Sequence, residues 1–108
     1  QLEQLDLFVS NKRDLAALYS NFFQSTAIKF INEPDKAKSN YWLCAIRFKN
    51  REERDIFLQE SNDSGVMTRP SWTLMNELTM FKDSVSTSCS NSKLLQNTIV
   101  NIPSSVRF

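Results

Sequence analysis

Arg69 and Trp72 are the residues of this sequence best suited to bind a ligand. The guanidinium of Arg69 can hold a phosphate or a carboxylate through two parallel hydrogen bonds, and Pro70 stiffens the backbone beside it. The indole of Trp72 offers a large apolar face and one N–H donor. A surface salt bridge accounts for Arg69 equally well, and a core anchor beneath the loop is the interpretation favoured for Trp72. Asn40, which precedes an apolar segment, is a third candidate, although a turn residue is the favoured interpretation there.

Two absences restrict the chemistry that the chain can perform by itself. The sequence contains no histidine, which removes Ser-His-Asp and Cys-His nucleophilic sites and most zinc catalysis. It contains a single glycine, Gly65, whereas the Walker loop and the G-x-G-x-x-G turn need several. The densest carboxylate pair, Glu52-Glu53, lies at an expected helix start, where acids interact favourably with the helix dipole. We therefore predict neither a catalytic residue nor a metal site in this chain.

The composition predicts one small globular domain. The 108 residues are 41% hydrophobic and 23% charged, with a net charge of +1, which is ordinary for such a domain. A nucleic-acid module would show clustered lysines and arginines, and no apolar run is long enough to span a bilayer. Cys44 lies in an apolar run and is expected to be a buried free thiol. We expect a cytoplasmic protein without a nucleic-acid or membrane partner.

The hydrophobic periodicity predicts an α+β fold, in which helices pack on a small, mostly antiparallel sheet of three to four strands. The expected elements are a helix over 2–23, strands over 26–31 and 41–48, a helix from 51 to about 61 or 62, a strand over 66–68, a helical turn near 76–81, a helix over 93–98 and a strand over 99–102. Asn50 and Glu53 predict a capping box at the second helix, and Gly65 predicts its end, with a positive φ. Ser90 or Asn91 is expected to cap the third helix.

The segment 41–48 is apolar at alternate positions on both faces, which predicts a central strand covered on both sides. Trp42 is accordingly expected in the core. The short strand at 66–68 is expected to end before Pro70, because proline cannot donate to the hydrogen-bond ladder. The first helix lacks an N-cap residue ahead of it, which suggests a cut inside a longer helix.

Four blocks of the sequence resemble one protein family in order and spacing. They are SNYWL at 39–43, GVMTRPSW at 65–72, LTMF at 78–81 and NIPSS at 101–105. Together they are similar to the C-terminal domain of the DegT/DnrJ/EryC1/StrS sugar aminotransferases. The Arg-Pro-x-Trp version resembles the branch that acts on 4-keto nucleotide sugars for legionaminic acid, bacillosamine and related surface glycans. The leading helix resembles the long helix that joins the two domains of these enzymes.

The resemblance implies that residues 1–108 are the C-terminal small domain of a fold-type-I transferase, a fragment without the N-terminal domain that binds pyridoxal phosphate. In that family a large-domain lysine holds the cofactor as a Schiff base, and glutamate usually supplies the amino group for a keto-sugar linked to a nucleotide. The active site lies at a homodimer interface, and the small domain closes one side of it. None of the lysines here stands in the context of the family lysine, and no acid matches the partner of the pyridinium nitrogen. The chain alone is therefore expected neither to bind the cofactor stably nor to transaminate.

By the same resemblance, Arg69, Trp72 and Asn40 are candidates for substrate binding. Leu2, Leu5 and the segment 74–81 are candidates for an exposed apolar patch that docks the large domain, so we expect self-association or marginal stability of the chain. The alternative is a free-standing α+β binding or interaction module without catalytic activity. A related branch of the family that dehydrates its sugar also fits these residues.

Overall fold

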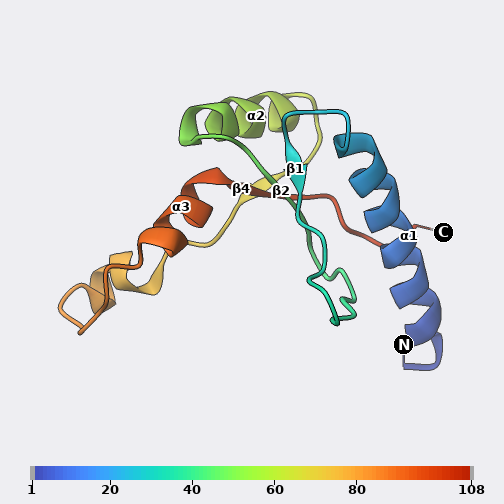
Figure 1. The fold of residues 1–108 in the computed structure, drawn as a ribbon, viewed down its shortest axis with the longest axis horizontal. Coiled ribbons are helices and arrows are strands. Elements are labelled where there is room, and N and C mark those ends of the chain that lie inside the picture. Colours follow the sequence, from blue (N-terminus) through green and yellow to red (C-terminus); the bar gives the residue numbers. More distant parts are fainter. Residues whose placement is uncertain (1, 108) are drawn as a thin grey trace.

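The computed structural model describes residues 2–107 and contains the element order that the periodicity predicts (Figure 1). The helices and strands are α1 (Leu5–Phe23), β1 (Lys29–Phe30), β2 (Cys44–Arg47), α2 (Arg51–Asp63), β3 (Arg69–Pro70), α3 (Ser90–Thr98) and β4 (Ile99–Ile102). Short 3-10 turns occupy Leu2–Gln4, Met75–Glu77 and Thr79–Phe81. Within residues 2–107, no helix is long and apolar enough to cross a bilayer.

The four strands form one antiparallel sheet in the order β1-β2-β4-β3. The α+β class is therefore confirmed, with helices packed on a small sheet. Strands β2 and β4 are central, and they align Cys44 with Ile102 and Ile46 with Val100. Strands β1 and β3 are the edges, and each pairs over only two residues.

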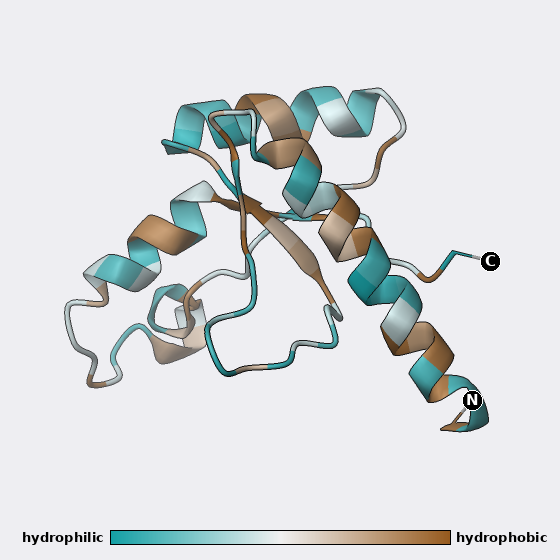
Figure 2. Ribbon diagram, turned by 45° about the vertical axis from the view of Figure 1, so that its right-hand side comes forward, coloured by the Kyte–Doolittle hydropathy of each residue, from teal (hydrophilic) through white to brown (hydrophobic). Residues whose placement is uncertain are grey.

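Helices α1 and α2 pack on one face of this sheet. The core on that face contains Cys44 and Ile46 of β2 and Val100 and Ile102 of β4, all buried. The partly buried side chains packed against it are Tyr19 and Phe23 of α1, Ile28, and Phe57 and Leu58 of α2. Figure 2 shows hydrophobic segments in the central strands and on these helices, and a mostly hydrophilic loop between β1 and β2. Cys44 is a buried free thiol, as predicted, and burial raises the pKa of its side chain.

The opposite face of the sheet, which we call the open face, differs from the prediction of a strand covered on both sides. Ala45 and Arg47 of β2 are only half-buried, and Trp42 is 68% exposed, so its expected place in the core is wrong. The reason lies at Tyr41, whose φ of 45° is left-handed and breaks the extended backbone before the strand begins. Tyr41 is thereby buried beside Phe30, while the next residue turns outward.

The third strand also lies elsewhere than predicted, at Arg69–Pro70 in place of 66–68. Pro70 is tolerated because β3 is an edge strand with β4 as its neighbour in the sheet, and proline within sheets is confined to such edges. Thr68 is buried and held by polar contacts with α2. Its hydroxyl lies 2.6 Å from the hydroxyl of Ser61 and 3.0 Å from the amide nitrogen of Asn62.

Of the three residue-level signals predicted at helix ends, two are confirmed. The side chain of Asn50 accepts a hydrogen bond of 2.9 Å from the backbone N–H of Glu53, and Gly65 has a φ of 78°. Helix α3 differs, because it begins at Ser90 behind Cys89, which has a left-handed φ of 47° and makes no side-chain cap. The prediction that Ser90 or Asn91 caps this helix is therefore wrong.

Candidate functional site

A hollow of about 250 Å3 lies where β2 begins, β4 ends and β3 enters the sheet. It brings together Arg69 and Trp72, two of the three residues singled out from the sequence, and adds Trp42. The complete lining consists of Trp42, Leu43, Met67, Arg69, Pro70, Trp72, Asn101 and Ile102. We call this feature the tryptophan hollow.

Among the described residues, the guanidinium of Arg69 has no strong acceptor. Its side chain is exposed, and one Nη lies 3.6 Å from the thioether sulfur of Met67, which is a weak acceptor. No ion pair within residues 2–107 involves Arg69, so the surface salt bridge considered for it is not observed. The guanidinium can therefore still donate to a phosphate or a carboxylate.

Both tryptophans at the hollow are open to solvent. Trp72 is 69% exposed, so the expectation that it anchors the core is wrong. Trp42 was missed as a site residue because its apolar neighbours suggested a strand. A usable signal precedes it, since an asparagine side chain often accepts a hydrogen bond from the backbone N–H two residues later and so forms a local turn. Two exposed indoles beside one guanidinium form a surface suited to a ligand with both a ring and an anionic group.

Asn40 does not line the hollow but holds Trp42 in place. Its Oδ1 accepts a hydrogen bond of 3.0 Å from the backbone N–H of Trp42, which is the turn role favoured from the sequence. From the other side, the ammonium of Lys12 on α1 donates to the carbonyl of Trp42 at 3.4 Å and to the carbonyl of Ser104. The backbone of Trp42 is therefore held by a local turn at Asn40 and by Lys12, which is distant in sequence.

A buried serine links the two central strands at this end of the sheet. The Ser104 hydroxyl accepts a hydrogen bond of 2.7 Å from the backbone N–H of Cys44 and donates one of 2.7 Å to the carbonyl of Ile102. Both backbone groups lie at the rim of the hollow, because Ile102 lines it and Cys44 follows Leu43. Ser104 thus shapes the terminal turn and also holds β2 against the end of β4.

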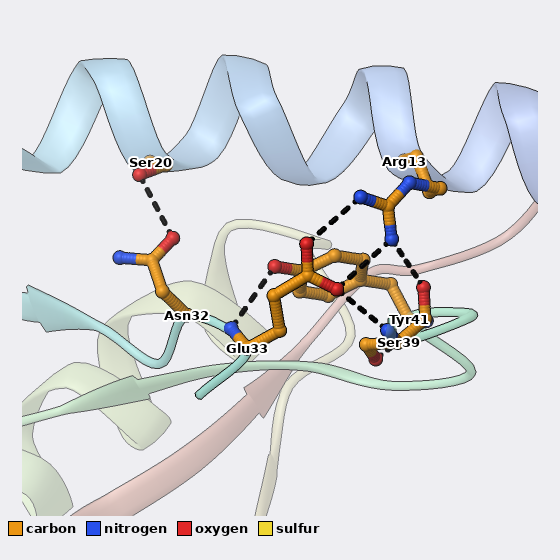
Figure 3. A network of polar contacts seen from close by, with 6 residues as sticks. All are labelled: Arg13, Ser20, Asn32, Glu33, Ser39 and Tyr41. Atoms are coloured by element: carbon orange, nitrogen blue, oxygen red, sulfur yellow. Dashed lines mark hydrogen bonds and ion pairs between the residues drawn. The ribbon is translucent and has the colours of Figure 1, made fainter. Parts of the chain in front are cut away.

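The loop between β1 and β2 is attached to α1 by a polar network (Figure 3). Arg13 and Glu33 form a two-pronged ion pair, with nitrogen–oxygen distances of 2.8 and 3.0 Å. Arg13 also donates to the Ser39 carbonyl at 2.6 Å, and the Ser39 N–H donates to Glu33 at 2.5 Å. The backbone N–H of Glu33 donates to the hydroxyl of Tyr41 at 3.2 Å, and the Arg13 guanidinium lies 5.8 Å from the centroid of the Tyr41 ring.

We call the residues Arg13, Glu33, Ser39 and Tyr41 the loop clasp. The hydrogen bond from Arg13, followed by the one from the Ser39 N–H, lowers the pKa of the Glu33 carboxyl to about 2. The same bond to Glu33 raises the pKa of Arg13 above its ordinary value. The ion pair therefore persists across the physiological pH range and holds the loop that carries Trp42.

The residues present do not fit a pyridoxal-phosphate centre. Lys12 is the one partly buried lysine, and two backbone carbonyls occupy its ammonium. The other six lysines are exposed, whereas the cofactor needs an enclosed lysine and an acid at the pyridine nitrogen. Within residues 2–107, no group of three or more histidine, cysteine, aspartate or glutamate residues lies close enough to hold a metal ion.

A family model, a sequence relative and a solved structure all relate this chain to aminotransferases or sugar-nucleotide enzymes. The model of the DegT/DnrJ/EryC1/StrS aminotransferase family matches residues 1–108. GDP-perosamine synthase from Escherichia coli O157:H7 is 29% identical over 83 residues, which are 77% of this chain and 22% of that protein. The aminotransferase TlmJ from Streptoalloteichus hindustanus superimposes with a TM-score of 0.86 at 18% identity, over 96% of this chain and 28% of its own.

The Spr1654 protein of Streptococcus pneumoniae, in its PLP form, superimposes with a TM-score of 0.85 at 17% identity. That match covers 99% of this chain and 29% of Spr1654. At these identities the structural likeness establishes a shared fold. The chain spans less than a third of the length of each of these relatives.

Proposed function

Since this chain belongs to the DegT/DnrJ/EryC1/StrS aminotransferase family, we propose that residues 1–108 form the C-terminal small domain of an aminotransferase that acts on a nucleotide-linked keto-sugar. In this proposal the chain contributes no catalytic residue. It closes one side of a substrate site whose cofactor, pyridoxal phosphate, is held by a larger N-terminal domain in a homodimer. The share of each relative that the chain spans supports a domain of a longer protein.

The tryptophan hollow is the observation that carries this proposal. It joins an exposed guanidinium and two exposed indoles in one concave surface. A nucleotide sugar presents the matching groups, because it combines flat or puckered rings with ionised phosphates. We assign Arg69 to an anionic group of the substrate and Trp72 and Trp42 to its ring faces. Asn40 acts through Trp42.

The relatives and the resemblance of the Arg-Pro-x-Trp segment support the proposed substrate class. One relative is named for GDP-perosamine, an amino sugar linked to a nucleotide, and another is known in a PLP form. We propose glutamate as the amino donor and a 4-keto nucleotide sugar as the acceptor. The legionaminic acid and bacillosamine branch remains our proposal for the sugar itself.

Two separate surfaces are expected to dock the larger domain. Leu2 lies in the 3-10 turn before α1 and Leu5 begins α1, whereas the exposed Met75 and Met80 lie in the segment before α3, on the other side of the molecule (Figure 1). Each exposes large apolar side chains. We propose that at least the end of α1 is covered in the complete protein.

The test is amino transfer by the protein encoded by the complete reading frame that contains this chain. Arg69→Ala should lower kcat/KM for a 4-keto nucleotide sugar by roughly tenfold or more, the effect of losing a hydrogen bond to a charged group. Arg51→Ala is the matched control, because Arg51 is exposed and pairs with Asp55 in its own helix. Equal rates for Arg69→Ala and the parent protein would contradict the assignment of Arg69. Amino transfer by residues 1–108 alone would contradict the proposal that the catalytic residues lie in another domain.

A further inference from the structure

The charged residues of the four strands are all basic. The strands contain Lys29, Arg47 and Arg69 and no aspartate or glutamate, although the whole chain has a net charge of only +1. A strand places successive side chains on opposite faces, and residues directly opposite each other in neighbouring strands share a face. The register therefore decides whether these three cations lie together.

The register places all three on the open face. Lys29 is opposite Arg47, while Arg69 is opposite Asn101, which is itself opposite Ala45. Because Ala45 and Arg47 are two residues apart in β2, they point to the same side. The neighbouring positions Phe30 and Ile46 point to the helix-covered face, where both are buried. We call Lys29, Arg47 and Arg69 the cation face.

The arrangement of the cation face is electrostatically unfavourable without an anion. Like charges directly opposite each other in a sheet repel, and Lys29 and Arg47 are such a pair. Within residues 2–107, no carboxylate forms an ion pair with any of the three cations. An acid, Glu53, shares the lining of a hollow with Lys29 and Arg47, and its carboxylate accepts a hydrogen bond of 3.2 Å from the side chain of Asn50.

The surface around these cations has room for a ligand. A second hollow, of about 560 Å3, is lined by Ala27, Lys29, Arg47, Phe48, Lys49 and Glu53. Between Arg47 and Arg69 the open face of β4 carries Ile99, which is opposite Arg47, and Asn101, which is opposite Arg69 and can donate from its amide. From strand spacing and rise, the two arginine Cα atoms lie roughly 12 Å apart. Two flexible guanidinium side chains of this length can reach a common anion from opposite sides.

We propose that the cation face binds the diphosphate of a nucleotide-linked ligand, with Arg69 and Arg47 on either side of it and Lys29 beside Arg47. This inference rests on the proposed function for the identity of the ligand, and it adds the phosphate-binding residues Arg47 and Lys29. A diphosphate suits the site because two adjacent ionised groups can engage two separate guanidinium forks. The rings of the same ligand then extend from Arg69 into the tryptophan hollow, which Arg69 also lines.

The probe for this site is inorganic pyrophosphate, titrated calorimetrically into the 108-residue chain at low ionic strength. We expect saturable binding that weakens as salt is added and weakens about tenfold in Arg47→Ala and in Lys29→Ala. Lys82→Ala is the matched control, because Lys82 is exposed and lies outside the strands. UDP and GDP should bind more tightly than pyrophosphate, and Trp72→Ala should remove that difference.

Each possible result of the titration either supports or contradicts the proposal. Absence of saturable binding would overturn it, as would equal weakening by Lys82→Ala. Tighter binding of an acidic peptide than of pyrophosphate would overturn it in favour of an acidic protein surface. Arg47→Gln serves as a second variant without the guanidinium charge, and circular dichroism checks that it is folded. Because this titration needs no turnover, pyrophosphate binding that depends on Arg47, combined with no amino transfer by the complete protein, would contradict the proposed function and leave the anion site standing.

Discussion

The helix-covered face and the open face of the sheet carry residues of opposite character, although they share the same strands. Ile46 and Val100 on the covered face are fully buried against α1 and α2. Arg47 and Arg69 on the open face are cations without an acidic partner within residues 2–107. The covered face supplies stability through apolar burial. Because the covered face stabilises the fold, the open face can carry cations that repel one another and that could bind a ligand.

The largest expected effect comes from substitution on the covered face. Ile46→Ala removes a side chain that is 0% exposed at the centre of the core, and it should lower the free energy of unfolding by about 2–5 kcal/mol. The matched control is Ile99→Ala, because Ile99 is half-buried on the open face of the neighbouring strand. Urea unfolding of both variants measures the contrast. Equal losses would show that both faces are packed to the same degree.

Ser104→Ala tests the connection between the central strands, and it should have the second largest effect. The substitution leaves the N–H of Cys44 without its partner in a buried setting. Leaving such a donor unsatisfied costs about 1–3 kcal/mol. Ser105→Ala is the control, since Ser105 is exposed. A change of less than a few tenths of a kcal/mol in Ser104→Ala would mean that the two strands do not depend on this contact.

The contrast between the faces also explains which parts of the structure were predictable from the sequence. The cap at Asn50, the positive φ at Gly65 and the final strand depend on local patterns, and all three are confirmed. The edge position of Pro70 depends on strand order, which a local pattern does not contain. The exposure of Trp42 depends on a single left-handed residue, Tyr41, that interrupts the alternation of apolar positions.

The site was predictable only in part, for a related reason. Arg69 and Trp72 stand within one short segment, and the structure places both at the same hollow. Lys12 and Ser104 act on this hollow across 92 residues of sequence, and Arg13 reaches Glu33 across 20 residues. Single-sequence periodicity cannot detect such pairs, because it records only neighbours within a few residues.

We expect the loop clasp to weaken at acid pH. The folded pKa of Glu33 is lowered from its ordinary value of 4.5 to about 2. The clasp therefore stabilises the fold fully above pH 4.5, and this contribution is lost as the pH falls toward about 2. Glu33→Gln should melt at a lower temperature than the parent chain at pH 7, and the difference should shrink below pH 4.

Thermal unfolding followed by tryptophan fluorescence from pH 2 to pH 7 measures this prediction. Glu60→Gln serves as the control, because Glu60 is an exposed residue of α2 outside the clasp. A difference in melting temperature between Glu33→Gln and the parent that is the same at pH 3 and pH 7 would contradict the role of the Glu33 carboxylate.

The smallest expected change in stability is the one that most sharpens the comparison of the two faces. Arg47→Ala should leave the free energy of unfolding unchanged or raise it by a few tenths of a kcal/mol, because it removes the repulsion from Lys29 across the strand pair. Arg54→Ala is the opposite control, since Arg54 is buried, donates to the Gln96 carbonyl at 3.0 Å and pairs with Asp55. Its removal should destabilise the chain measurably. If Arg47→Ala proved as costly as Arg54→Ala, the open face would be a structural surface, and its cations would need no ligand to explain them.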